Sequence, residues 1–138
     1  AGVAEVPDDA GIILVHDAAR PLVPADLVDR VLAGLADGAD GAIPVLPIDD
    51  TVKRVDTAGA VVATLDRSEL RAVQTPQAFL ADALRRAVVA DDRATGTDCA
   101  SLVERTGGRV VTVSGDPRTM KVTTRADLER AEALRDAD

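Results

Sequence analysis

Short aliphatic runs alternate with amphipathic stretches along most of this chain. Residues 12–15 are four consecutive apolar residues, and residues 41–45 form a second short apolar run. Between them, residues 25–36 place leucine and valine at helical spacing, with Pro24 suited to the first turn and Gly38 to the end. The pattern predicts a strand–helix–strand unit with a right-handed crossover, whose first strand is buried on both faces of a parallel sheet.

Residues 46–69 depart from this pattern. Polar and apolar residues alternate over 51–55, a turn is expected at 56–59, and a second extended run covers 60–65. This order predicts a β-hairpin. Because a hairpin inserted into an α/β pattern leaves the main sheet, we expect it to contact a second subunit rather than form a solvated flap.

The alternation of strands and helices resumes after the hairpin. Pro76 is expected to end a strand, Thr97 or Asp98 to begin a helix, and Gly107-Gly108 to stop that helix. The predicted elements are a strand at 71–75, a helix at 79–91, a loop at 91–96, a helix ending at 105 and a strand at 109–113.

The C-terminal part contains a capping signal. Residues 120–122 are expected to be extended, and Thr124 with Asp127 has the spacing of a capping box for a last helix. Leu128, Ala131 and Leu134 would form its inner face. The predicted fold class is α/β, with a mostly parallel sheet and one inserted hairpin.

Composition supports one domain with an aliphatic core. The chain has 138 residues, of which 46% are hydrophobic, and Phe79 is the sole aromatic residue. A core of valine, leucine, isoleucine and alanine suits a parallel sheet covered by helices.

Charge and cysteine content exclude several classes of function. The net charge of −8 and the lack of a basic run argue against nucleic-acid or anionic-membrane partners. Cys99 is the single cysteine and His16 the single histidine, so we expect neither an internal disulfide nor a zinc cluster. No signal peptide or membrane-length apolar run is present, and a cytoplasmic protein is predicted.

The segment after residues 12–15 is the first candidate site. Asp17 would lie at the carboxyl end of a strand, where open α/β folds bind ligands, and Ala18 and Ala19 would allow a ligand close to the backbone. A turn-forming aspartate is an equal alternative. His16 is expected to be a hydrogen-bonded structural residue.

Phosphate-binding loops of the two common glycine-rich spacings do not occur, nor does the turn of serine hydrolases. A phosphorylated ligand would therefore be bound by side chains at the sheet edge. The chain has only two lysines, Lys53 and Lys121, which suggests that lysine is used locally.

Six separated segments, taken together, resemble one enzyme family over residues 11–134. The segments, in order, are His16-Asp-Ala-Ala-Arg-Pro21, Asp49-Asp-Thr-Val-Lys53, Asp66-Arg67, Gln74-Thr-Pro-Gln77, Thr97-Asp98 with Ala100-Ser101, and Lys121-Val-Thr-Thr124. On these segments the chain is similar to the 2-C-methyl-D-erythritol 4-phosphate cytidylyltransferases of the non-mevalonate isoprenoid pathway.

The resemblance implies both fold and reaction. It implies a Rossmann-like sheet of the glycosyltransferase-A-like nucleotidyltransferase type, with residues 1–138 as the C-terminal portion of one domain and 46–69 as a homodimer arm. The phosphate of the acceptor attacks the α-phosphorus of CTP and releases pyrophosphate. Mg²⁺ bridges the triphosphate, and no metal ligand is assigned to this chain.

Roles for seven residues follow from the resemblance. Local alternatives are a strand cap for Thr75 and an ion pair with Asp66 for Arg67. The implied assignments are Asp17 and Lys121 as catalytic residues, Asp17 and Ala18 at the nucleotide, and Arg20, Thr51, Arg67 and Thr75 at the acceptor.

Two departures from the family pattern limit these implications. Cys99 stands where relatives often carry an acidic residue, and a thiol there is expected to pack as a small apolar group. The family's N-terminal glycine-rich segment is missing, so the isolated chain is expected to be inactive. The alternatives are a cytidylyltransferase for ribitol 5-phosphate and a non-catalytic nucleotide-binding or dimerisation module.

Overall fold

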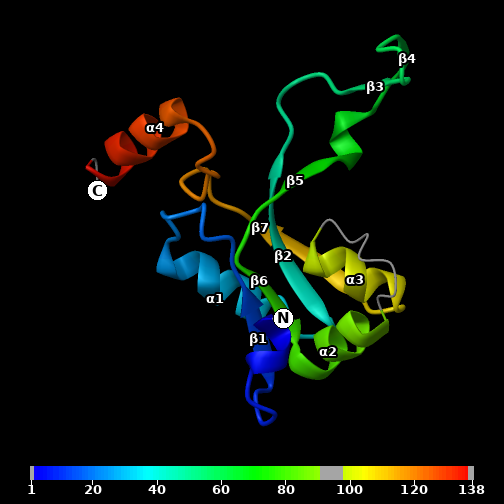
Figure 1. Ribbon diagram of the computed structural model, residues 1–138, viewed down its shortest axis with the longest axis vertical. Helices are drawn as coiled ribbons and strands as arrows, with labels where there is room; N and C mark the ends of the chain where they lie inside the picture. The colour runs from blue at the N-terminus through cyan, green and yellow to red at the C-terminus, as the bar shows by residue number, and fades with distance from the viewer. Residues whose placement is uncertain (1, 91–97, 137–138) are drawn as a thin grey trace.

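The computed structural model describes residues 2–90 and 98–136 and has an α/β fold (Figure 1). A short 3₁₀ helix, η1 (Gly2–Glu5), precedes the first strand, and a second, η2 (Arg67–Glu69), follows the hairpin. The strands are β1 (Ile12–Val15), β2 (Gly41–Pro47), β3 (Lys53–Val55), β4 (Val61–Thr64), β5 (Arg71–Val73), β6 (Gln77–Leu80) and β7 (Val110–Ser114). The helices are α1 (Ala25–Ala33), α2 (Ala81–Ala90), α3 (Cys99–Arg105) and α4 (Arg125–Arg135).

The main sheet is mixed. β7 pairs with β2 in parallel, whereas β5 and β6 both pair antiparallel to β2, and β6 also pairs antiparallel to β1. The strands β1, β2 and β7 therefore run in one direction and β5 and β6 in the other. The α/β class is confirmed, but the expected parallel neighbours occur only at β2 and β7. The predicted strand–helix–strand unit forms with β6 between its two strands.

One face of β1 is exposed, so the prediction that this strand is buried on both faces is wrong. Ile13 lies in a core cluster with Leu84 of α2, whereas Ile12 is 45% and Leu14 is 43% exposed. An aliphatic run shows that a strand can be buried, but its neighbours decide which face is covered.

The predicted helix over 79–91 is also wrong at its start. Residues 77–80 form β6, and α2 begins at Ala81. Phe79 is fully buried and lies opposite Ile13 of β1 and Gly41 of β2, where a Cβ on Gly41 would come within 2.7 Å of its ring. The only aromatic side chain thus fills the centre of the sheet, which a helix at this position would not allow.

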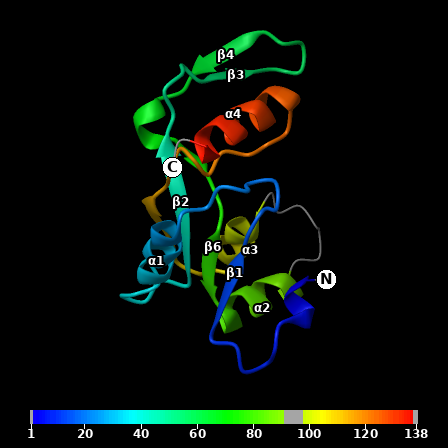
Figure 2. The same ribbon diagram turned by 90° about the vertical axis from the view of Figure 1, so that its left-hand side faces the viewer.

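Helices cover the two faces of the sheet (Figure 2). On one face, Leu84 of α2 and Val103 of α3 pack against Ile43 and Phe79. On the other face lies α1, which begins after Pro24 as predicted. Its C-cap is Gly34 rather than the expected Gly38, and a Cβ on Gly34 would lie 2.7 Å from the side chain of Ala42.

The predicted hairpin is confirmed. β3 and β4 form a separate antiparallel pair that projects from the main sheet (Figure 1). Asp56 stabilises the turn, because one carboxylate oxygen accepts hydrogen bonds from the backbone of Ala58 and Ala60, both at 2.9 Å. Gly59 has a φ of +84°, a conformation that glycine adopts without strain.

The C-terminal elements largely follow the predictions. Asp98 caps α3, whereas Thr97 and the predicted loop at 91–96 lie outside the described residues. Thr124 and Asp127 form the predicted capping box of α4. Ala131 is buried, but Leu128 is 48% exposed and does not belong to an inner face.

Among the described helices, none combines the length and apolar character needed to cross a membrane.

Candidate functional site

Asp17 and Lys121 form an ion pair at the carboxyl edge of the sheet. Asp17 follows β1 and Lys121 follows β7, and these two strands run in the same direction. The Lys121 Nζ atom lies 2.9 Å from Asp17 Oδ2, and Asp17 Oδ1 accepts a hydrogen bond of 3.0 Å from the backbone of Ala19. The structure thus brings together the two residues predicted to be catalytic.

The Asp17 carboxylate is held in its charged form. The hydrogen bond from Lys121 lowers the pKa of Asp17 most, followed by the Ala19 backbone N–H, and the charges of Lys121 and Arg20 act in the same direction. These effects outweigh the partial desolvation. The Lys121 side chain is 50% and the Asp17 side chain 32% exposed, so both groups remain accessible to a ligand.

Thr75 lies beside Asp17, in the short segment between β5 and β6. Residues 74–76 separate β5 from β6, and the Thr75–Pro76 peptide bond is cis. The Thr75 hydroxyl accepts a hydrogen bond of 3.1 Å from the Asp17 backbone and lies 2.9 Å from His16 Nδ1. His16 Nε2 in turn lies 3.0 Å from the carbonyl oxygen of Arg20.

Arg20 joins the segment after β1 to two other segments. Its guanidinium donates to the carbonyl oxygens of Thr119 at 2.7 Å and Val73 at 3.4 Å. Its backbone N–H donates to the carbonyl of Asp17 at 2.9 Å. These contacts fix the segment after β1, and Arg20 also lines the pocket next to Asp17, where the acceptor role was predicted.

Gln74 stands in one of the family-like segments, but the sequence assigned no role to it. Its buried side-chain amide accepts a hydrogen bond of 3.0 Å from the Asp116 backbone N–H and donates one of 2.9 Å to the Asp116 carbonyl. A Cβ on Gly115 would lie only 2.3 Å from Gln74 Oε1. A third link runs from the Val122 backbone to the carbonyl of Ala19 at 2.7 Å. These contacts fix the loop that carries Lys121.

A pocket of about 470 Å³ opens beside Asp17 and Thr75. Gln77 and Asp98, which had no predicted role at the site, contribute to its lining, and Gln77 Nε2 donates to Asp98 Oδ2 at 3.0 Å. Cys99 lines the pocket as well. Partial burial, and then the charge of Asp98, raise the pKa of the Cys99 thiol, so the group stays neutral as expected of a packing residue.

Arg67 and Thr51 lie at the base of the hairpin. Arg67 begins η2, and its guanidinium donates to the backbone carbonyls of Ile48 and Asp49. Asp66 accepts from the backbone and hydroxyl of Ser68 instead of pairing with Arg67. Both Thr51 and Arg67 are exposed, and neither belongs to the described lining of the pocket beside Asp17.

Side chains suited to a metal are sparse at this site. Within residues 2–90 and 98–136, no three His, Cys, Asp or Glu side chains are grouped closely enough to hold an ion. Ala18, which is exposed, adds only backbone groups and a methyl group beside Asp17. The arrangement therefore offers the Lys121 ammonium, the Asp17 carboxylate and the Thr75 hydroxyl to a polar, phosphorylated ligand, while Arg20 and Asp98 add a second charge of each sign to the pocket wall.

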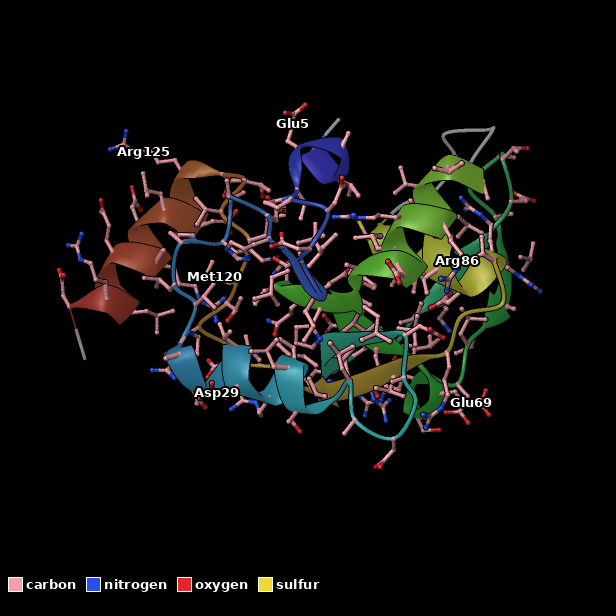
Figure 3. All side chains as sticks on the ribbon, turned by 90° about the horizontal axis from the view of Figure 1, so that it is seen from below. Glu5, Asp29, Glu69, Arg86, Met120 and Arg125 are labelled. Carbon is pink, nitrogen blue, oxygen red and sulfur yellow. The ribbon has the colours of Figure 1, made fainter. Side chains whose placement is uncertain are left out.

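Figure 3 shows the described side chains on the ribbon and labels Met120, which lies on the segment that leads to α4. Met120 directly precedes Lys121 in the sequence. Met120 is partly buried, whereas Lys121 is exposed. The alternation turns the ammonium group of Lys121 away from the covered side of this segment and toward Asp17.

Comparison with known proteins gives a consistent family. The family model described as "IspD: 2-C-methyl-D-erythritol 4-phosphate cytidylyltransferase" matches residues 1–136. The cytidylyltransferase of that name from Rhodococcus opacus is 56% identical over 134 residues, covering 97% of this chain and 58% of the relative. The one from Nocardia farcinica is 55% identical over 136 residues, covering 99% of this chain and 58% of the relative.

Solved structures agree with the sequence match. The crystal structure of the Thermus thermophilus enzyme has a TM-score of 0.80 at 39% identity, over 91% of this chain and 62% of that one. The Anaerococcus prevotii 4-diphosphocytidyl-2C-methyl-D-erythritol synthase has a TM-score of 0.87 at 26% identity, over 98% of this chain and 63% of that one.

The chain spans about 58% of the length of the Rhodococcus and Nocardia relatives. It belongs to the 2-C-methyl-D-erythritol 4-phosphate cytidylyltransferase family.

Proposed function

We propose that the protein carrying this chain transfers a cytidylyl group from CTP to 2-C-methyl-D-erythritol 4-phosphate in isoprenoid precursor synthesis. An oxygen of the acceptor phosphate forms a bond to the α-phosphorus of CTP, and the bond from that phosphorus to the β-phosphate oxygen breaks to release pyrophosphate. The observation that carries the proposal is the Asp17–Lys121 pair beside a pocket, in a chain of this family.

Lys121 supplies the positive charge that this reaction needs. The attacking phosphate and the triphosphate are both anionic, so their approach needs a cation near the reacting oxygens. The Lys121 ammonium is half-exposed, so it can contact a phosphate while remaining close to Asp17. It would stabilise charge that develops on phosphate oxygens during transfer.

Asp17 is suited to bind hydroxyl groups. Its lowered pKa keeps the carboxylate ionised at neutral pH, and an ionised carboxylate only accepts hydrogen bonds. Sugar and polyol hydroxyls supply the matching donors. We assign Asp17 to the ribose and the acceptor hydroxyls, with the backbone of Ala18 beside the ribose.

Arg20 and Thr75 act next to this pair. The Arg20 guanidinium is hydrogen-bonded to Thr119 and Val73, so we assign it to the acceptor side as the group that holds the pocket wall in position. Thr75 contacts the Asp17 backbone and lines the same pocket, which supports its assignment to the acceptor.

Magnesium fits this site as an ion carried by the nucleotide. Mg²⁺ usually keeps several waters and binds phosphates with one or two carboxylates. The carboxylate of Asp17 already accepts from Lys121 and Ala19, and no described cluster supplies further ligands. The CTP phosphates would therefore hold the ion, which would neutralise part of their charge.

The hairpin supports a homodimer. Val55, Val61 and Val62 are each more than half exposed on an element that projects from the sheet (Figure 1). Exposed apolar residues grouped on one element favour contact with a partner. We propose a cytoplasmic homodimer in which Arg67 and Thr51 of one arm contact the acceptor bound to the neighbouring subunit.

Assaying the full-length protein with CTP and two acceptors tests the proposal. Release of pyrophosphate is expected with 2-C-methyl-D-erythritol 4-phosphate. Turnover with ribitol 5-phosphate but not with 2-C-methyl-D-erythritol 4-phosphate would show that the proposed acceptor is wrong. Binding of CTP without transfer to either acceptor would favour a nucleotide-binding module.

A further inference from the structure

We propose that His16 is a positioning residue that fixes the direction of the Thr75 hydroxyl, so that Thr75 presents an acceptor to the pocket. The inference rests on the proposed function, because it states which part of the polyol phosphate lies beside Thr75. Both His16 and Thr75 line the pocket next to Asp17.

The hydrogen-bond partners of His16 determine its tautomer. The Arg20 carbonyl, 3.0 Å from Nε2, can only accept a hydrogen bond, so Nε2 carries the hydrogen. In a neutral imidazole, Nδ1 is then an acceptor. The Thr75 hydroxyl, 2.9 Å from Nδ1, must be the donor in that contact.

The hydrogen bonds that the Thr75 hydroxyl can still make to a ligand follow from counting its hydrogen and its lone pairs. A threonine hydroxyl has one hydrogen and two lone pairs. Its hydrogen is directed to His16, and one lone pair accepts the Asp17 backbone N–H at 3.1 Å. One lone pair is left for a ligand, and no donor.

Thr75 and Asp17 therefore present the same polarity to a ligand. The Asp17 carboxylate is charged and accepts only, because its pKa is lowered chiefly by Lys121. Two neighbouring acceptors suit the hydroxyl groups of a polyol, and they repel a phosphate, which is itself an acceptor. This end of the pocket would hold the hydroxyls of the acceptor and direct its phosphate toward the Lys121 ammonium.

The opposite hydrogen-bond direction would reverse the preference. If Nδ1 carried the hydrogen, it would donate to Thr75, and the Thr75 hydroxyl would donate into the pocket. The charged groups that contact or adjoin His16 and Thr75 are Asp17 and Arg20 on the same segment, Lys121 across from Asp17, and Asp98 on the pocket wall. His16 thus selects between hydroxyl and phosphate at this position.

The first test is nitrogen NMR of isotope-labelled histidine in the unliganded full-length protein. The pH is set well above the ordinary histidine pKa of about 6.5. His16→Gln identifies the His16 signals by their loss. We expect a protonated Nε2 and a bare Nδ1. A protonated Nδ1, in the neutral ring or the cation, would overturn the proposal. This measurement needs no turnover, so it decides the point whichever acceptor the enzyme uses.

The second test is a double-mutant cycle that joins His16→Gln with Thr75→Val. His16→Gln can retain a donor to the Arg20 carbonyl but loses the ring Nδ1 that accepts the hydrogen bond from Thr75. It is expected to raise the KM for the acceptor about fivefold, the usual effect of one lost hydrogen bond, with little change in the KM for CTP. In the Thr75→Val background the same change should have almost no further effect.

Thr112→Val, on an exposed position of β7, is the matched control and should leave both KM values unchanged. Additive effects of His16→Gln and Thr75→Val would overturn the positioning role. If the protein transfers to neither polyol phosphate, the proposed function fails, whereas the NMR measurement still establishes or excludes the direction of the Thr75 hydrogen bond.

Discussion

Lys121 lies 2.9 Å from Asp17, although one follows the last strand of the sheet and the other follows the first. The pair forms because β1 and β7 run in the same direction and end at the same edge. The loop after β7 is then fixed to the segment after β1 by Arg20 and by the carbonyl of Ala19. Both charges are thereby held where a phosphorylated ligand can reach them.

Removing the ammonium group should abolish most of the activity. Lys121→Ala in the full-length protein is expected to lower kcat by about a hundredfold or more, as for loss of other groups that stabilise transition-state charge. The only other lysine, Lys53, lies on the exposed hairpin and donates to Thr64 at 2.6 Å. Lys53→Ala is therefore the matched control and should retain near-normal kcat. Similar losses in both variants would contradict the role of Lys121.

The same substitution should change the titration of Asp17. Lys121 is the largest cause of its lowered pKa, so Lys121→Ala should raise the pKa of Asp17 toward the ordinary value. Because the pKa is lowered in the folded state, the pair stabilises the protein above the ordinary aspartate range and loses this effect as pH falls through the folded pKa. Carboxyl NMR measures the shift. An unchanged Asp17 pKa in the variant would contradict the ion pair in solution.

Gly115 should not tolerate a side chain. A Cβ there would lie 2.3 Å from Gln74 Oε1, and displacing the buried Gln74 amide breaks its two hydrogen bonds to the part-buried backbone of Asp116. Gly115→Ala is expected to destabilise the protein by about 1–3 kcal/mol, the usual cost of an unsatisfied buried polar group, and to lower kcat by moving Lys121. Denaturant unfolding and turnover measure both effects.

Gly11→Ala is the control for that substitution, since a Cβ at Gly11 would meet nothing within 4 Å. Its stability and kcat should match those of the unsubstituted protein. Equal behaviour of the two alanine variants would show that the Gln74 contacts do not hold the loop.

Arg67 should act on the neighbouring subunit. Arg67→Ala is expected to raise the KM for the acceptor more than that for CTP, and Arg54→Ala, exposed on β3, is its control. Mixing Arg67→Ala with Lys121→Ala subunits should restore activity, because a mixed dimer contains one site with both residues intact. No recovery in mixed dimers of verified composition would place Arg67 in its own subunit's site.

The capping box of α4 should titrate at low pH. The backbone N–H of Thr123 and the hydroxyl and backbone of Thr124 lower the pKa of Asp127 to about 2. Asp127 should thus stabilise the start of α4 at neutral pH, and this effect should disappear only as pH falls through about 2. Thr124→Ala is expected to raise the pKa of Asp127 and to speed amide exchange in α4. An unchanged exchange rate would contradict the cap.

Local patterns in the sequence were sufficient for several elements. The hairpin and the box formed by Thr124 and Asp127 depend on residues close together in the chain, and both are present. The predicted helix start at Phe79 was wrong, because the sequence alone does not show whether a short apolar run beside a helix belongs to that helix or forms a strand. The burial of Phe79 between β1 and β2 decides it, and that burial depends on residues distant in sequence.

The candidate site was predicted only in part, because some of its contacts join residues that are distant in the sequence. Asp17 was found through its position after a strand, Lys121 through the scarcity of lysine in the chain, and both through the resemblance to a family. The role of Gln74 was missed, although the residue stands in a family-like segment, because its partners are backbone groups of Asp116, which no side-chain pattern reveals. His16 was expected to be structural, and its hydrogen bonds fit that view, but its contact with Thr75 links it to the pocket.

The most direct test of the central claim is phosphorus NMR of the reaction of CTP with 2-C-methyl-D-erythritol 4-phosphate, catalysed by the full-length protein. Signals of the cytidine diphosphate ester and of pyrophosphate should appear together with the unsubstituted and Lys53→Ala proteins, and be almost absent with folded Lys121→Ala. Equal product formation by the Lys121→Ala protein would contradict the assignment of the Asp17–Lys121 pair to the reacting end of the site.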